Sequence, residues 1–176
     1  MVSEDIQAAR DEYLAIMHDH GIKHPDAIVD SLRETQGELL AIFSSVSEER
    51  AGRKPAPDEW SLHELAQHAV FTEQLIAKLV HHMARSSTPA PEDFEGAGIG
   101  MMPKANDRTY VQVLDDLRLA NDVLLDAVRN LPEAPDKEMK LPHPFFGPLN
   151  CTEWARFQRV HDLDHIQHAR KIIAVV

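Results

Sequence analysis

The chain has 176 residues, enough for one domain with a hydrophobic core and short for two. Its 29 acidic and 18 basic residues give a formal net charge of −11, which argues against binding to nucleic-acid phosphates or to an anionic membrane surface. No run of apolar residues approaches the length of a membrane span, and no secretory signal is recognisable. The single cysteine, Cys151, excludes an internal disulfide and a cysteine-rich zinc site. We therefore expect a cytoplasmic protein.

Apolar residues at helical spacing predict helices along most of the chain. A leading helix is expected over residues 3–20, and Pro25 suits the first turn of the helix that follows. Ser61 and Glu64 have the spacing of a capping box, which predicts the start of another helix that runs to about Arg85.

Two proline-rich connections separate the later helices. Residues 86–106 predict a long irregular connection, of a kind that often covers functional sites. A helix is expected over residues 107–131, and residues 132–149 form a second loop with five prolines. After this loop, Asn150 and Glu153 predict the start of the last helix.

Together these elements predict one all-α domain over residues 1–176. Residues 1–22 would hold the leading helix, and residues 25–174 would form a four-helix bundle. No run of useful length alternates polar and apolar residues, so no strand is expected.

Histidines occupy a face of the last helix that should be buried. Three- and four-residue steps connect Trp154, Phe157, His161, His165, His168 and Ile172. His161 and His165 stack one turn apart, which presents two nitrogen ligands to a metal ion. His68 faces inward from another helix and is the natural third ligand, because bundle metal sites use side chains from facing helices. Three histidines leave a coordination position open, as catalytic sites do; the alternative is a hydrogen-bonded polar core.

Several further residues are expected near this site or at the surface. His168 continues the histidine face by one turn and is expected to line the pocket rather than to ligate. Asp164 could hydrogen-bond an imidazole, whereas Asp162 points away, and a solvated charge is the simpler expectation for both. His143 lies in a loop that could fold over the site and contact substrate, and His63 is expected to be exposed.

Three spaced segments are similar to one known family. They are Pro57-Asp-Glu-Trp-Ser-Leu-His-Glu-Leu-Ala-Gln-His68, the loop His143-Pro-Phe-Phe-Gly-Pro-Leu, and Glu153-Trp-Ala-Arg-Phe followed by His161-x-x-x-His165. Over residues 25–174 the chain resembles the DinB/YfiT-like superfamily. The resemblance implies an up-down-down-up bundle with a metal triad at His68, His161 and His165.

Two features depart from the family pattern. The leading helix is additional, and His168 stands where relatives often have glutamine. The resemblance implies a range of activities, because relatives include metal-dependent enzymes that join or use low-molecular-weight thiols. Other relatives are regarded as metal-dependent hydrolases, and many have no known substrate.

The sequence therefore supports competing functional hypotheses. The first is a metal-dependent enzyme, a thiol S-transferase or a hydrolase, in which a divalent ion held by neutral imidazoles favours bound hydroxide or thiolate. Imidazole suits zinc, nickel, copper and iron alike; we expect zinc or nickel, with iron as a further candidate. The second is a non-enzymatic, stress-related metal- or ligand-binding bundle whose site His168 closes. The third is a structural dimer module with buried histidines; a homodimer is expected and is compatible with all three.

Overall fold

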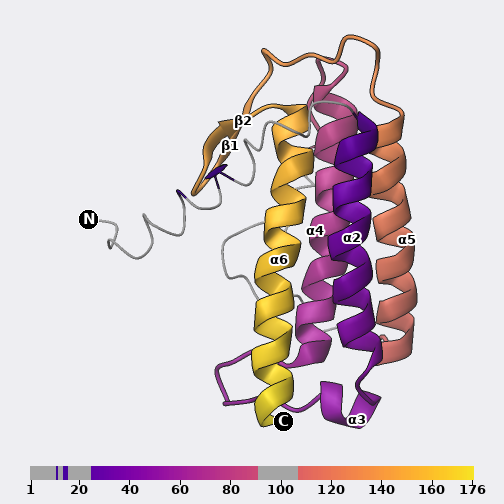
Figure 1. The fold of residues 1–176 in the computed structure, drawn as a ribbon, viewed down its shortest axis with the longest axis vertical. Helices are drawn as coiled ribbons and strands as arrows, with labels where there is room; N and C mark the ends of the chain where they lie inside the picture. Colours follow the sequence, from indigo (N-terminus) through magenta and orange to yellow (C-terminus); the bar gives the residue numbers. More distant parts are fainter. Residues whose placement is uncertain (1–10, 12–13, 16–24, 91–106) are drawn as a thin grey trace.

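Figure 1 shows a computed structural model of the chain, which describes residues 11, 14–15, 25–90 and 107–176. Four long helices pack side by side: α2 (Pro25–Ser44), α4 (Leu62–Met83), α5 (Tyr110–Arg129) and α6 (Cys151–Val175). The short elements are α3 (Glu48–Ala51), β1 (Leu141–His143) and β2 (Gly147–Leu149). The predicted four-helix bundle is confirmed. Most of the predicted leading helix, and residues 91–106 of the first long connection, lie outside the described residues.

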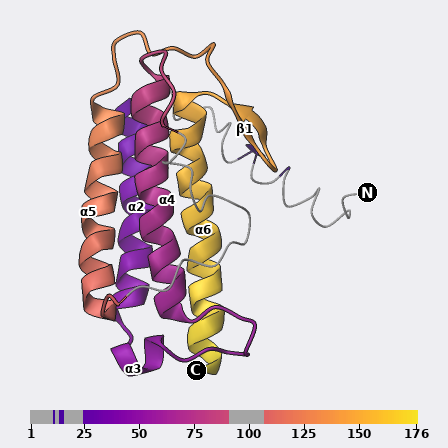
Figure 2. The ribbon, with the colours of Figure 1, turned by 180° about the vertical axis from the view of Figure 1, so that it is seen from behind.

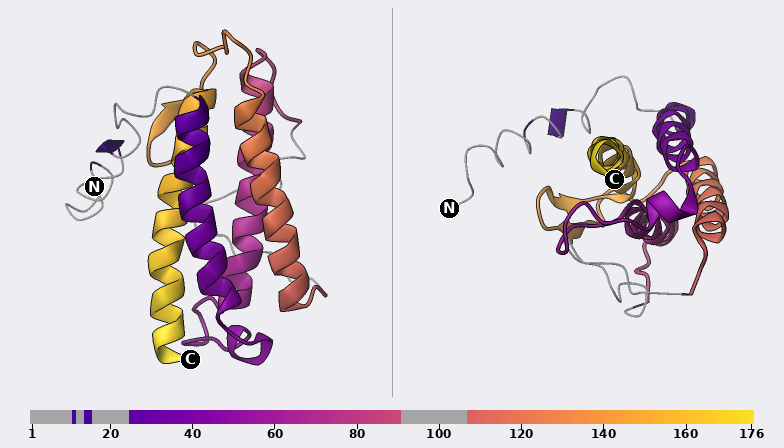
Figure 3. Two further views of the ribbon diagram at one scale, coloured as in Figure 1. Left: turned by 45° about the vertical axis from the view of Figure 1, so that its right-hand side comes forward. Right: turned by 90° about the horizontal axis from the view of Figure 1, so that it is seen from below.

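The helices follow the course that the family resemblance implied. In Figures 1 and 2, α2 runs from the hairpin end of the bundle to the α3 end, α4 and α5 both run back, and α6 returns. Each helix packs on two neighbours, in the cyclic order α2, α5, α4, α6, as the view along the bundle in Figure 3 shows. Because α4 and α6 are adjacent, residues on their facing sides can form one site.

The predicted helix starts are confirmed by their hydrogen bonds. The Glu64 backbone N–H donates to Ser61 Oγ at 3.2 Å, and the Ser61 backbone N–H donates to the Glu64 carboxylate at 2.8 Å. Asn150 and Glu153 make the same reciprocal pair at the start of α6. Such a cap satisfies backbone donors that the first helical turn leaves unpaired, and is worth about 1 kcal/mol.

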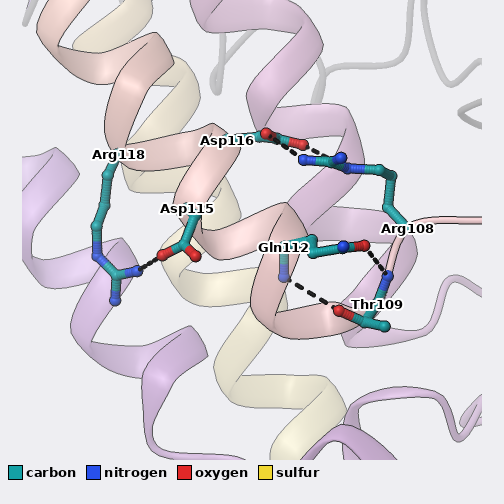
Figure 4. Close-up of polar contacts among 6 residues, drawn as sticks. All are labelled: Arg108, Thr109, Gln112, Asp115, Asp116 and Arg118. Carbon is teal, nitrogen blue, oxygen red and sulfur yellow. Dashed lines mark hydrogen bonds and ion pairs between the residues drawn. The ribbon is translucent and has the colours of Figure 1, made fainter.

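The start of α5 has a capping box that the sequence analysis did not identify. Thr109 and Gln112 bond reciprocally, as Figure 4 shows, so the helix begins at Tyr110 rather than at residue 107. Arg108 adds a two-pronged ion pair to Asp116, with nitrogen–oxygen distances of 3.0 and 2.6 Å. These contacts fix the position at which α5 begins.

The apolar core is divided into two parts by a polar layer. Toward the hairpin, the first part draws on residues 28–32, 76–84, 124–128 and 149–160. Toward α3, the second part draws on residues 39–51, 62–69, 110–117 and 166–172. Between them, at mid-height on all four long helices, lie the buried side chains of Thr35, Gln36, Glu73, Asn121, Gln158 and Asp162. We call these six residues the polar layer. Among the described residues, no helix is long and apolar enough to cross a membrane.

The expectation that the chain contains no strand is wrong for the loop over residues 132–149. There, β1 and β2 form an antiparallel hairpin in which Leu141 pairs with Leu149 and His143 with Gly147. Gly147 has a φ of +75°, which closes the short turn and would strain any other residue. Strands of three residues with a proline in each are too short to show an alternating pattern.

Candidate metal centre

The structure brings together the three histidines that the sequence nominated as metal ligands. His68 lies on α4, and His161 and His165 lie one turn apart on α6. One ring nitrogen from each falls within 4.8 Å of the others, and the Nε2 atoms of His68 and His161 are 3.2 Å apart. The rings of His161 and His165 are 4.0 Å apart between centroids. Their binding of a metal stays a prediction.

The donor set fits a divalent ion. With nitrogen–metal bonds of about 2.0–2.1 Å, tetrahedral ligation separates two imidazole nitrogens by roughly 3.3–3.4 Å, close to the separation of His68 from His161. Both ring nitrogens of His165 and the Nδ1 atom of His161 are buried with no hydrogen-bond partner among the described residues. An unsatisfied buried polar atom costs about 1–3 kcal/mol, so the cluster lacks a partner that a cation would supply.

Burial keeps the three imidazoles neutral. Loss of solvation lowers the pKa of His68 to about 4, with a smaller contribution from the charge of His168. Burial, followed by the charges of His68 and His143, lowers the pKa of His161 to about 3. The pKa of His165 is lowered well below its usual value, chiefly by burial. A neutral imidazole has a free lone pair, which is the form that ligates a metal.

His168 lies beside the cluster without joining it. Among the described residues, the group that could hold an ion contains three side chains, and His168 is not one of them. Its ring is 6.2 Å from that of Trp60, which in turn packs edge-on against His68 at 4.9 Å. Trp60 and His168 therefore border the His68 side of the site.

The hairpin supplies the opposite border. The His143 ring packs at centroid distances of 4.4 Å on Phe157, 4.8 Å on Phe146 and 5.3 Å on Trp154. Phe157 also packs on the His161 ring at 5.6 Å, so it connects the hairpin to the histidine cluster. The loop containing His143 therefore lies near the site, and its contact with substrate stays a prediction.

Asp164 lies near a ligand without bonding to it directly. Its Oδ2 atom is 4.0 Å from His165 Nδ1, beyond hydrogen-bond distance, and its side chain is 58% exposed. A largely exposed carboxylate at this distance is screened by water.

The expectation that Asp162 is a solvated charge is wrong. It is fully buried; Thr35 Oγ1 donates to its Oδ2 at 3.2 Å and Gln158 Nε2 donates to its Oδ1 at 2.8 Å. The reason is that α6 packs on both α2 and α4, so its buried arc is wider than the histidine stripe. Residues 158, 162, 165 and 169 form a second inward line at three- and four-residue steps, and this spacing could have revealed it.

Sequence reasoning also missed Glu73, which is 1% exposed at the centre of the polar layer. Its carboxyl oxygens accept hydrogen bonds from Gln36 Nε2 at 3.0 Å and from Gln158 Nε2 at 3.1 Å. Burial raises the pKa of Glu73 well above its usual value, and the charge of nearby Asp162 raises it further. The signal was present, because Glu73 falls at helical spacing from Ala69, Ile76, Ala77 and Val80, which are all buried.

A smaller correction concerns His63, which was expected to be exposed. It is half-buried, and its ring packs edge-on against Tyr110 at 5.5 Å. Burial lowers its pKa, because α5 begins beside the first turn of α4. It does not belong to the three-histidine group found among the described residues.

The fold and the site define a class: a four-helix bundle with a cluster of three histidines contributed by two adjacent helices. The chain belongs to the DinB superfamily, whose sequence pattern it matches over residues 31–169. It is 24% identical, over 154 residues, to the uncharacterized protein YuaE of Bacillus subtilis (strain 168), covering 79% of this chain and 90% of YuaE. The crystal structure of TT2238, a four-helix bundle protein, superposes with a TM-score of 0.61 at 21% identity, covering 84% of this chain and 98% of that one. This second likeness supports the fold alone.

Proposed function

We propose that this protein is a metal-dependent enzyme that transfers a low-molecular-weight thiol to a small electrophilic substrate. The main support for this proposal is that one ring nitrogen from each of three neutral imidazoles lies within 4.8 Å of the others. No fourth protein ligand is found in the described part of the chain. A catalytic site has this arrangement, because a coordination position is left for a reacting molecule. The described residues thus give no support to the alternative in which His168 is a fourth ligand that fills the open coordination position.

A divalent ion at this site, which we expect to be zinc or nickel, would lower the pKa of a coordinated thiol or water. His68, His161 and His165 would hold it, and their own neutrality leaves its charge uncompensated. His68 and His161 are partly exposed residues, which gives a fourth ligand access to the site from solvent.

The surroundings of the triad favour a thiol over water as the nucleophile. Hydrolysis usually requires a positioned group that takes a proton from water during the reaction. Among the described residues, no carboxylate is within hydrogen-bond distance of the triad, and Asp164 lies 4.0 Å from His165. A thiol starts from a pKa of about 8.5 and water from about 15.7, so a coordinated thiol is the more fully deprotonated of the two and depends less on such a base. Its sulfur forms a bond to the electrophilic carbon while the bond to the leaving group breaks, and the leaving group departs with that electron pair.

The test compares the two reactions in one preparation. Untagged protein loaded with Zn²⁺ is assayed with cysteine and 1-chloro-2,4-dinitrobenzene, which reports thiol transfer, and with p-nitrophenyl acetate, which reports hydrolysis. The proposal expects thiol-dependent turnover that is lost in His161→Ala and retained in His81→Ala, a change of an exposed histidine on α4. Ester hydrolysis without thiol transfer would favour a hydrolase, and equal background rates in wild type and His161→Ala would contradict both.

A further inference from the structure

His143 is held by its own hairpin in one orientation and one tautomer. Its Nδ1 atom accepts hydrogen bonds from the backbone N–H groups of Phe145 at 3.2 Å and Phe146 at 3.3 Å. A neutral imidazole whose Nδ1 is an acceptor carries its proton on Nε2. Burial lowers the pKa of His143 to about 4, so this neutral form is present at pH 7.

Three aromatic rings hold the His143 side chain in place. Phe146 comes from the same turn, whereas Trp154 and Phe157 come from the first turns of α6. Because Phe157 touches both the His143 and the His161 rings, the cluster extends from the hairpin to the metal ligands. The charge of a protonated His143 would reach His161, which agrees with this proximity. The rings of Phe146, Trp154 and Phe157, with the His143 imidazole among them, therefore form an apolar border of the site.

The turn does not require the Nε2 atom. Capping of the backbone N–H groups uses Nδ1, and the shorter side chains of Asn and Asp commonly do this in turns. In the described part of the chain Nε2–H has no hydrogen-bond partner, and His143 is half-buried. A rigid N–H donor thus lies beside apolar rings, and the described residues offer it no acceptor.

We infer that His143 is a specificity-determining residue, whose Nε2–H donates a hydrogen bond to a carbonyl or carboxylate oxygen of the small molecule bound at the histidine triad. This inference rests on the proposed function and adds the chemistry of the ligand to it. The ligand would carry an apolar portion that packs on Phe157 and Phe146, with an acceptor oxygen next to it. A donor that a bound ligand cuts off from water without offering it an acceptor costs free energy, so ligands that lack a matching oxygen are disfavoured there and ligands that have one are selected.

The experiment distinguishes the contribution of the ligand's oxygen to binding from the contribution of its metal-binding sulfur. Untagged protein is loaded with Co²⁺, the metal content is measured, and the sulfur-to-cobalt absorption band is titrated with mercaptoacetamide and with 1-propanethiol. Both probes offer the same sulfur atom, and only mercaptoacetamide has a carbonyl oxygen. His143→Asn keeps an acceptor for the turn and removes the Nε2 donor, whereas His143→Phe keeps the aromatic packing. His81→Asn changes an exposed histidine and is the matched control.

The ratio of the two dissociation constants is the deciding quantity, because any chelation of cobalt by the carbonyl is the same in every variant. The ratio of the propanethiol dissociation constant to the mercaptoacetamide dissociation constant is expected to be about three- to tenfold larger in wild type and His81→Asn than in the two His143 variants. This range corresponds to one hydrogen bond. An unchanged ratio in His143→Asn, with cobalt and propanethiol still bound, would overturn the inference and leave the proposed function intact. Failure of wild type to bind cobalt or either thiol would instead contradict the proposed function. Should His143→Phe unfold, His143→Asn alone decides the result.

Discussion

The Nε2 atoms of His68 and His161 lie 3.2 Å apart although 93 positions separate the two residues in the chain. No hydrogen-bond partner is found for Nδ1 of His161 among the described residues, so the ring is held by packing and by this approach. The contact depends on the course of the bundle, which places α4 and α6 side by side. Two neutral imidazoles at this distance share at most one proton, whereas a cation would engage both lone pairs.

Metal binding should stabilise the folded protein. Zinc at a hundred times its dissociation constant is expected to raise the free energy of unfolding by about 2.7 kcal/mol, because the unfolded chain does not hold the three ligands together. Urea unfolding with zinc and with EDTA measures the difference. In His68→Ala the difference should fall close to zero, and an equal shift in wild type and variant would place the binding elsewhere.

The metal-free protein should lose stability as the pH falls. The pKa values of His68 and His161 are lowered to about 4 and about 3, so between roughly pH 6.5 and pH 4 these residues take up protons in the unfolded chain and not in the folded one. Each contributes a slope of about 1.4 kcal/mol per pH unit in that window, and its contribution is fully present above it. Urea unfolding in EDTA from pH 4.5 to 8 measures this slope, and His68→Phe should reduce it. Because the buried carboxyl of Glu73 contributes in the opposite sense over the same window, the comparison with His68→Phe is decisive, and equal slopes in wild type and variant would contradict the neutral triad.

Glu73→Gln should change the pH dependence in the opposite sense. The pKa of Glu73 is raised by burial, so the contribution of its proton to stability is present below about pH 4.5 and is lost as the pH rises through the folded-state pKa. A glutamine is neutral at every pH, and Gln36 Oε1, which has no partner among the described residues, can turn to accept from its amide. Relative to wild type, the variant should therefore gain stability at pH 8 compared with pH 5. Parallel unfolding curves at the two pH values would show that Glu73 is ionised in the fold.

Asp164→Asn should have a small effect on metal binding. The carboxylate lies 4.0 Å from His165 Nδ1 and is largely exposed, so water screens it. We expect zinc affinity to fall less than about tenfold, below the tenfold to hundredfold typical of a carboxylate bonded directly to a metal-ligating histidine. Competition with a chromophoric chelator measures this affinity. A loss above a hundredfold would mean that the loaded site draws Asp164 into direct contact with His165.

The sequence was sufficient for features that repeat at helical spacing or have a local hydrogen-bond pattern. The histidine stripe on α6 and the caps at Ser61 and Asn150 belong to this group. The burial of Asp162 and Glu73 was not predicted, because a charged side chain on a helix is ordinarily solvated. Their burial depends on amide donors from other elements or turns, chiefly Gln36 and Gln158, and the sequence does not show that these donors converge. The hairpin at His143 was not predicted, because its strands are too short to show an alternating pattern.

The most direct test of the three-histidine centre is the stoichiometry of metal binding. Untagged protein is dialysed against Zn²⁺ or Ni²⁺ and then against metal-free buffer, and the bound metal is measured for wild type, His161→Ala and His81→Ala. We expect about one ion per chain in wild type and in His81→Ala, and almost none in His161→Ala. Wild-type protein without metal, or His161→Ala with a full equivalent, would contradict it.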